Sequence, residues 1–223
     1  MEQLIRFKKR VSGRESELED LVADDLCALF PDWDGPRWAA ASPTIGAGMP
    51  DLLLVDCNPQ VLRLSSLEDS CDNLLSYLRY VSKARIETII DRLGYSSKRA
   101  ETKLKELINL EVVESDGSLY WMASLWRNVL PRIVAIEVKV SDWQKAILQA
   151  YRNTIFAHQS FVALPSSIAE RIKRETIVKQ YGIGVLSINE NTGVRIIRSA
   201  RAQRPKVWSY YYRLASMVAR HLG

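Results

Sequence analysis

Apolar positions along the chain recur with two different periods and predict an alternation of helices and strands. Between residues 14 and 30 they are spaced three and four apart, which predicts an amphipathic helix that Pro31 ends. A second helix is expected from Ser141 to about residue 157, because Ser141 and Gln144 match a capping box. Two more are expected, one at 167–179 and one starting near residue 206. Runs rich in β-branched residues predict strands at 38–41, 52–56, 132–140, 161–164, 184–188 and 194–197.

The middle of the chain follows a different order of elements. Short helices are predicted at 73–81, 86–93 and 97–108, followed by a β-hairpin that turns at Asp116-Gly117. Three helices and a hairpin are the order of a winged helix, a variant of the helix-turn-helix. One strand ends before this section and its expected partner begins after it. We therefore predict an α/β core formed by residues 1–57 and 131–223, interrupted by a winged-helix-like insert at 58–130.

Composition narrows the class of protein. The chain has 223 residues, of which 47% are hydrophobic, enough to bury a core. It contains no apolar run of 18 residues, so neither a membrane span nor a membrane partner is expected. Three cysteines without C-x-x-C spacing argue against a disulfide framework or a structural zinc site and predict a cytoplasmic setting. Only two histidines occur, which directs attention to carboxylates and lysine.

Positive charge is concentrated at both ends of the sequence. The net charge is +5. The first cluster is Arg6, Lys8, Lys9, Arg10 and Arg14. After Glu190 the chain has seven lysines and arginines and no acidic residue. Such segregation suits a polyanionic partner such as nucleic acid, although solvated surface residues give the same pattern.

Three charged residues occur in strands whose other residues are suited to burial. Alternation along strand 132–140 places Glu137 and Lys139 on the face opposite its apolar residues, and Asp51 begins strand 52–56 at a glycine-rich turn. Buried charges need partners, so we expect the three side chains to meet. Two converging carboxylates suit Mg²⁺ or Mn²⁺, and a nearby ammonium suits phosphodiester hydrolysis. The alternative is an unrelated turn aspartate and an edge Glu/Lys pair, since E-x-K alone is a common pattern.

Three segments, GMPDLLLV (48–55), IVAIEVKVS (133–141) and QAYR (149–152), resemble the PD-(D/E)XK nuclease superfamily, which includes many restriction endonucleases and Holliday junction resolvases. The resemblance covers about residues 14–57 and 131–198. It implies a restriction-endonuclease-like mixed sheet flanked by helices, with Asp51, Glu137 and the Val138 carbonyl as metal ligands. Lys139 would position or activate the attacking water. One departure is the separation of Asp51 from Glu137 by 86 positions, where the family commonly has a short hairpin; the insert accounts for it.

The resemblance also implies accessory residues. A glutamate of the first helix often completes the site; Glu17 matches best by position, with Glu15 and Glu19 as rivals. Gln149 would help to shape the site. Lys145 and Arg152 share its helical face, which either meets phosphate or is an ordinary exposed stripe.

Residues at the start of the insert's third helix are candidates for nucleic-acid contact: Lys98, Arg99, Thr102 and Lys103. However, residues 58–131 hold ten basic and ten acidic residues, which is weak for a DNA-binding module. The insert could instead bind a protein partner or form a homodimer. The sequence therefore predicts a Mg²⁺- or Mn²⁺-dependent endonuclease acting on DNA. The alternative is a catalytically inactive DNA-binding or protein-interaction module on the same fold.

Overall fold

The computed structural model describes residues 4–9, 11–31, 37–67 and 71–223. The chain divides into two compact units. The first comprises Met1–Cys57 and Arg132–Lys206, and the second comprises Asn58–Pro131 and Val207–Gly223. The C-terminal segment from Val207 therefore belongs with the middle section of the chain, whereas the sequence pattern predicts that it joins the core.

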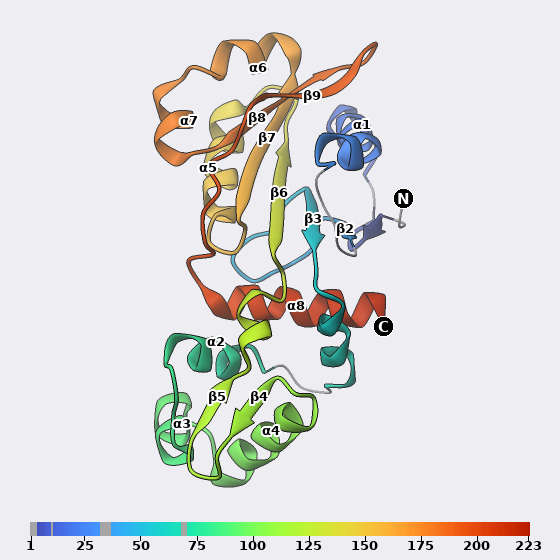
Figure 1. Ribbon diagram of the computed structural model, residues 1–223. Coiled ribbons are helices and arrows are strands. Elements are labelled where there is room, and N and C mark those ends of the chain that lie inside the picture. The colour runs from blue at the N-terminus through green and yellow to red at the C-terminus, as the bar shows by residue number, and fades with distance from the viewer. Residues whose placement is uncertain (1–3, 10, 32–36, 68–70) are drawn as a thin grey trace. The chain divides into compact units, whose positions relative to one another are not determined.

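A mixed sheet forms the centre of the first unit (Figure 1). Among the described residues it has seven strands, in the spatial order β1-β2-β3-β6-β7-β8-β9. Pairing is parallel for β1–β2, β6–β7 and β7–β8, and antiparallel for the other neighbours. The strands are β1 (Ile5–Arg6), β2 (Arg37–Ala41), β3 (Leu52–Asp56), β6 (Arg132–Val138), β7 (Gln159–Pro165), β8 (Gly184–Asn189) and β9 (Gly193–Arg198).

Helices cover both faces of this sheet: α1 (Arg14–Leu29), α5 (Trp143–Asn153), α6 (Ser166–Ile172) and α7 (Thr176–Tyr181). One core joins the apolar stripe of α1 to alternate residues of β3 and β6, including Leu52, Leu54, Val134, Ile136 and Val138. A second core joins α5, α6 and α7 to the other face of the sheet, where Val162 of β7 and Val185 of β8 are buried. The predicted alternation along residues 132–138 is confirmed. Each fully buried aliphatic side chain contributes about 1.5–3 kcal/mol.

Two boundaries differ from the sequence prediction. The helix expected at 167–179 is divided into α6 and α7, because Ile172 and Val178 both enter one core and a continuous helix would place them about 120° apart. Helix α5 begins at Trp143 with Asp142 as its N-cap, whose carboxylate accepts from the Lys145 N–H at 3.1 Å. The predicted capping box at Ser141 and Gln144 is therefore wrong by one residue.

The second unit contains the predicted order of three helices and a hairpin. Its elements are η1 (Pro59–Ser66), α2 (Asp72–Tyr80), α3 (Ile86–Leu93), α4 (Ser97–Asn109), β4 (Val113–Ser115), β5 (Tyr120–Met122), η2 (Ser124–Asn128) and α8 (Trp208–Leu222). The hairpin turns at Asp116, whose carboxylate accepts from the backbone of Ser118 and Leu119, and at Gly117, whose φ is 95°. Within the described residues no helix is both long and apolar enough to cross a membrane.

Helix α8 packs against η1 and α2 through an apolar face that contains two buried tyrosines. The Tyr211 hydroxyl accepts from the Leu130 N–H at 2.7 Å and donates to the Leu130 carbonyl at 3.2 Å. The Tyr212 hydroxyl donates to the Trp126 carbonyl at 3.1 Å. An amphipathic pattern identifies a helix but does not show which core it covers. For this reason the sequence prediction placed this helix in the α/β core instead of the second unit.

We expect Tyr211→Phe to lower the free energy of unfolding by about 1–3 kcal/mol, because both backbone groups of the buried Leu130 lose their hydroxyl partner. Urea unfolding followed by tryptophan fluorescence measures the change. Tyr210→Phe, on the same helix but only half-buried, is the matched control and should change stability by less than about 0.5 kcal/mol. Equal effects of the two substitutions would contradict the assigned role of the Tyr211 hydroxyl.

Candidate active site

Antiparallel pairing of β3 with β6 brings Asp51 to the end of β6. Leu52 lies opposite Ile136, so Asp51, one residue earlier, lies level with Glu137, and its carboxylate reaches the backbone of the next residue, Val138. The Val138 N–H donates to Asp51 Oδ2 at 2.8 Å. This bond joins residues separated by the whole insert, as the sequence analysis required.

Lys139 is held by three oxygens. Its ammonium donates to Glu15 Oε1 at 2.5 Å, to the Val138 carbonyl at 2.8 Å and to Asp51 Oδ2 at 3.1 Å. The side chain is only 11% exposed. Burial acts to lower the pKa of Lys139, but the carboxylates of Asp51 and Glu15 outweigh it and the pKa is raised. Lys139 is therefore a fixed cation among acids.

Glu137 is 1% exposed and uses one of its two oxygens. Oε1 accepts from Asn153 Nδ2 at 2.6 Å, whereas Oε2 has no hydrogen-bond partner among the described residues. Burial, followed by the negative charge of Asp51, raises the pKa of Glu137 to about 8, against the opposing effects of Asn153 and Lys139. Glu137 is thus a buried carboxyl with one oxygen left for a further partner.

Two glutamates of α1 complete an acidic cluster with Asp51. One oxygen from each of Glu15, Glu19 and Asp51 lies within 4.8 Å of the others. Burial raises the pKa of Glu19 to about 7, and the charges of Asp51 and Glu15 add to the effect. Positions i and i+4 share one helical face, which explains why Glu15 and Glu19 both reach Asp51.

The structure does not bring Glu17 to this cluster. Its side chain is 58% exposed and pairs with Arg14 at 2.9 Å. Two residues along a helix turn the side chain by about 200°, so Glu17 cannot share the face of Glu15 and Glu19. The sequence analysis preferred Glu17, but the structure places the two alternatives, Glu15 and Glu19, beside Asp51.

Helix α5 supplies Asn153, a residue that the sequence analysis missed. Asn153 is 2% exposed and lies on the apolar stripe of α5 with Ala146 and Ala150, where an amide needs a polar partner. A polar residue on the apolar stripe of a predicted helix was the feature of the sequence that could have identified Asn153. A Cβ at Gly48 would lie 3.1 Å from Asn153 Oδ1, so the turn before Asp51 approaches α5 closely and glycine suits it.

The other candidates on α5 are placed differently from one another. Gln149 lies one turn before Asn153, and its Oε1 is buried with no partner in the described part of the chain. Lys145 and Arg152 are exposed, as a surface role requires.

In the second unit, Lys98, Arg99 and Thr102 are exposed on α4. Lys103 is not: it is 5% exposed and its ammonium lies 3.4 Å from Glu106, so the expectation that it contacts nucleic acid is corrected. Acidic residues also lie on the hairpin, where Glu114 accepts from the Trp121 indole N–H. These acids would repel a phosphate backbone.

Comparison of the chain with protein-family models, with curated proteins and with solved structures gives no match. The chemistry of the site therefore has to follow from its own residues. The oxygens of Glu15, Glu19 and Asp51 lie close enough together that they could hold a cation. Outside this trio, Glu137 Oε2 is a buried oxygen without a partner among the described residues. Glu15, Asp51 and the Val138 carbonyl accept the three N–H groups of the Lys139 ammonium, so a bond from Lys139 to another ligand would have to replace one of these three.

Glu137→Gln should stabilise the protein at alkaline pH in the presence of EDTA. Folding raises the pKa of the Glu137 carboxyl from 4.5 to about 8. The native chain therefore loses folding free energy as the pH rises from 4.5 to about 8, because the folded state holds a proton that the unfolded state releases. The substituted amide can keep the bond from Asn153 and removes the repulsion with Asp51. The advantage of the variant over the native chain should grow between pH 5 and 8.5 by at least about 1.4 kcal/mol, one pKa unit.

Urea unfolding at the two pH values measures this difference. Glu17→Gln, an exposed site on α1, is the control and should show the same stability relative to the native chain at both. A pH-independent effect of Glu137→Gln would show that the buried carboxyl is not the source.

Proposed function

We propose that the chain is a divalent-metal-dependent nuclease of the PD-(D/E)XK kind that hydrolyses phosphodiester bonds of DNA. One observation carries the proposal: Asp51 and Lys139, chosen from sequence and 88 positions apart, bond to each other and meet two acids of α1, and Glu137 is buried beside Asp51. Lys139 bridges Asp51 and Glu15, and Glu137 keeps one oxygen without a donor in the described residues. Structural ion pairs seldom leave such a carboxylate unsatisfied.

Each residue has a role that its contacts support. Asp51, Glu137 and the acids of α1 would hold Mg²⁺ or Mn²⁺, with the Val138 carbonyl as a further oxygen. A bound ion would neutralise charge at phosphorus and lower the pKa of water. The Lys139 ammonium would orient water or a phosphate oxygen once one of its three bonds, to Glu15, Asp51 or the Val138 carbonyl, is exchanged for that ligand. Hydrolysis joins the water oxygen to phosphorus and breaks the bond to one bridging oxygen, which leaves with a proton.

Two further contacts keep the acids in place. Asn153 holds Glu137 through Oε1, and the Val138 N–H holds Asp51 through Oδ2. Both bonds orient a carboxylate without neutralising it. Loss of either contact should therefore weaken catalysis through positioning rather than through charge.

We also propose that the first unit is restriction-endonuclease-like and the second winged-helix-like. The mixed sheet with α1 and α5 on its two faces supports the former. Three helices, a hairpin and an isolated bridge between Ala84 and Tyr120 support the latter. The balanced charge of residues 58–131 and the acidic hairpin favour a protein partner or a second copy for the insert as much as DNA.

Purified protein should cleave plasmid or single-stranded DNA with Mg²⁺ or Mn²⁺ and not with EDTA. Asp51→Asn, Glu137→Gln and Lys139→Met should each lower the rate by about 100-fold or more, because each removes a ligand or the orienting cation. Gel assays with end-labelled DNA measure the rates. Glu17→Gln, an α1 glutamate outside the cluster, is the control and should keep the rate.

Cleavage that survives EDTA or the Asp51 and Lys139 substitutions would refute the mechanism. Tight DNA binding without cleavage under either metal would favour the alternative, an inactive DNA-binding module. An inactive protein could lack a metal site or could have been given the wrong substrate, and titration calorimetry with Mn²⁺ separates these two causes. Binding of Mn²⁺ that is lost in Asp51→Asn shows that the metal site exists and that the substrate was wrong.

A further inference from the structure

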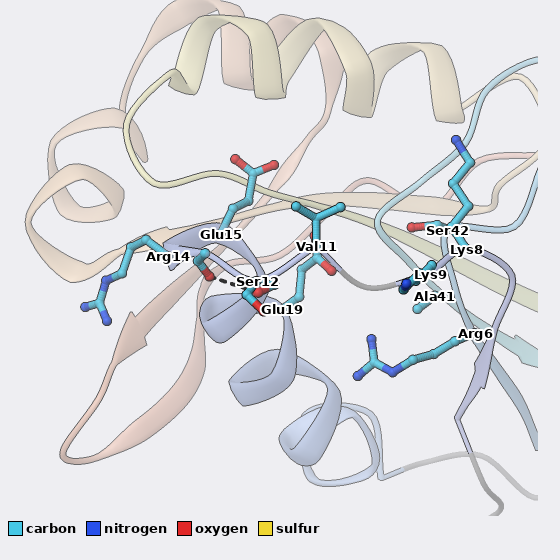
Figure 2. Close-up of a pocket in the computed structure, with 12 residues that line it drawn as sticks. Arg6, Lys8, Lys9, Val11, Ser12, Arg14, Glu15, Glu19, Ala41 and Ser42 are labelled. Carbon is cyan, nitrogen blue, oxygen red and sulfur yellow. Dashed lines mark hydrogen bonds between the residues drawn. The ribbon is translucent and has the colours of Figure 1, made fainter.

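A pocket of about 400 Å³ lies beside the acidic cluster in the first unit. The N-terminal segment, the start of α1 and the end of β2 form its walls (Figure 2). Glu15 and Glu19 belong to both the pocket and the cluster. Four cationic side chains also line it: Arg6, Lys8, Lys9 and Arg14.

The four cations differ in how far the protein already neutralises them. Arg6 pairs with Asp20 at 2.7 Å, and Arg14 pairs with Glu17 and Glu190. Lys8 and Lys9 are exposed and form no ion pair with the residues that the structure describes. Two positive charges are therefore available at the pocket wall. Arg10 lies outside the described residues.

Backbone contacts determine where these two lysines lie. The Phe7 N–H donates to the Ala41 carbonyl at 3.1 Å, and the Phe7 ring packs edge-on against Trp38 with centroids 6.0 Å apart. Arg6 ties the same segment to α1 through Asp20. The chain is thus anchored immediately before Lys8, at the mouth of the pocket.

Among charged side chains, the N-terminal segment contributes only cations to the pocket, whereas α1 contributes Arg14 together with Glu15 and Glu19. In Figure 2, Arg6, Lys8 and Lys9 project from the N-terminal segment, and Glu15 projects from α1. Glu15 is already bonded to Lys139. Gly13, the N-cap of α1, has no side chain to accept from the first backbone N–H groups of the helix, which lie at the pocket.

We infer that Lys8 and Lys9 bind a phosphate group of a nucleic-acid strand, next to the phosphodiester that the acidic cluster addresses. The position relative to cleavage rests on the proposed function, whereas phosphate binding by the two lysines does not. The phosphate is either an internal phosphodiester or a terminal phosphomonoester, because both present the same oxygens to an ammonium.

The test is DNA binding by the full chain in EDTA, where no metal-dependent cleavage occurs. The probes are fluorescein-labelled single strands and duplexes of about twelve nucleotides, each with and without a 5′-phosphate. Lys8→Ala/Lys9→Ala is compared with Arg174→Ala/Lys179→Ala, which removes two exposed cations from the α6–α7 segment of the same unit. Fluorescence anisotropy over a range of salt concentrations gives Kd.

The pocket variant should raise Kd about tenfold or more and reduce the slope of log Kd against log salt by about 1–2. Lys8→Glu/Lys9→Glu should weaken binding further. Equal weakening for all probes identifies an internal phosphate; loss confined to the 5′-phosphorylated probes identifies a terminal one.

An unchanged Kd, or a loss no greater than in the Arg174/Lys179 control, would overturn the inference. Circular dichroism confirms that the variants are folded; both lysines are exposed, so folding should be unaffected. The inference and the nuclease proposal fail independently. If binding depends on Lys8 and Lys9 but no cleavage occurs, the phosphate site stands and the nuclease proposal fails. If cleavage depends on Asp51 but binding does not depend on the two lysines, only the nuclease proposal stands.

Discussion

The hydrogen bond from the Val138 N–H to Asp51 Oδ2 joins the ends of two strands that a long insert separates in sequence. Because β3 and β6 pair along the whole length of β3, the insert leaves and re-enters the sheet at adjacent strands, and the sheet is continuous across the interruption. Asp51 then lies against Lys139, and Glu137 lies beside both. Every other contact of the site depends on this register, since a shift of one residue would turn Glu137 into the opposite core.

Charge in the site is unbalanced, because two carboxylates pair with the Lys139 ammonium and two further acids, Glu19 and Glu137, lie within electrostatic range of it. Lys139 bonds Asp51 and Glu15, whereas Glu19 and Glu137 have pKa values raised to about 7 and about 8. A purely structural ion pair would need one acid and one base. The excess of acids destabilises the site at neutral pH, and a bound cation would remove that cost. This imbalance is the physical basis on which we propose that the cluster is a functional centre rather than a fold-stabilising network.

Much of the fold and part of the site could be predicted from the sequence. Alternation along residues 132–138 separated Val134 and Ile136 from Glu137, and the pairing of interrupted strands followed from their apolar patterns. The face of α1 that meets the site was harder to predict from the sequence, which favoured Glu17. The apolar stripe through Leu18, Val22 and Leu26 instead directs Glu15 and Glu19 towards Asp51. Tertiary contacts decided the remaining cases. Lys103 is buried by its neighbours, and α8 joins the second unit, and neither follows from local pattern.

Opposite charges coexist at the pocket because backbone contacts, apolar packing and ion pairs to other residues hold each set in place. Phe7 is anchored to β2 and α1 is anchored by its apolar stripe, so Lys8 and Lys9 need not neutralise Glu15 and Glu19 to be positioned beside them. Under the proposed function this arrangement suits a strand of nucleic acid, because its phosphates would bind the lysines while the proposed hydrolysis would use the clustered carboxylates nearby. Direct ion pairing between the two sets would remove both functions at once. The short β1 strand, which the sequence analysis did not predict, is therefore the element that makes the two charge clusters compatible.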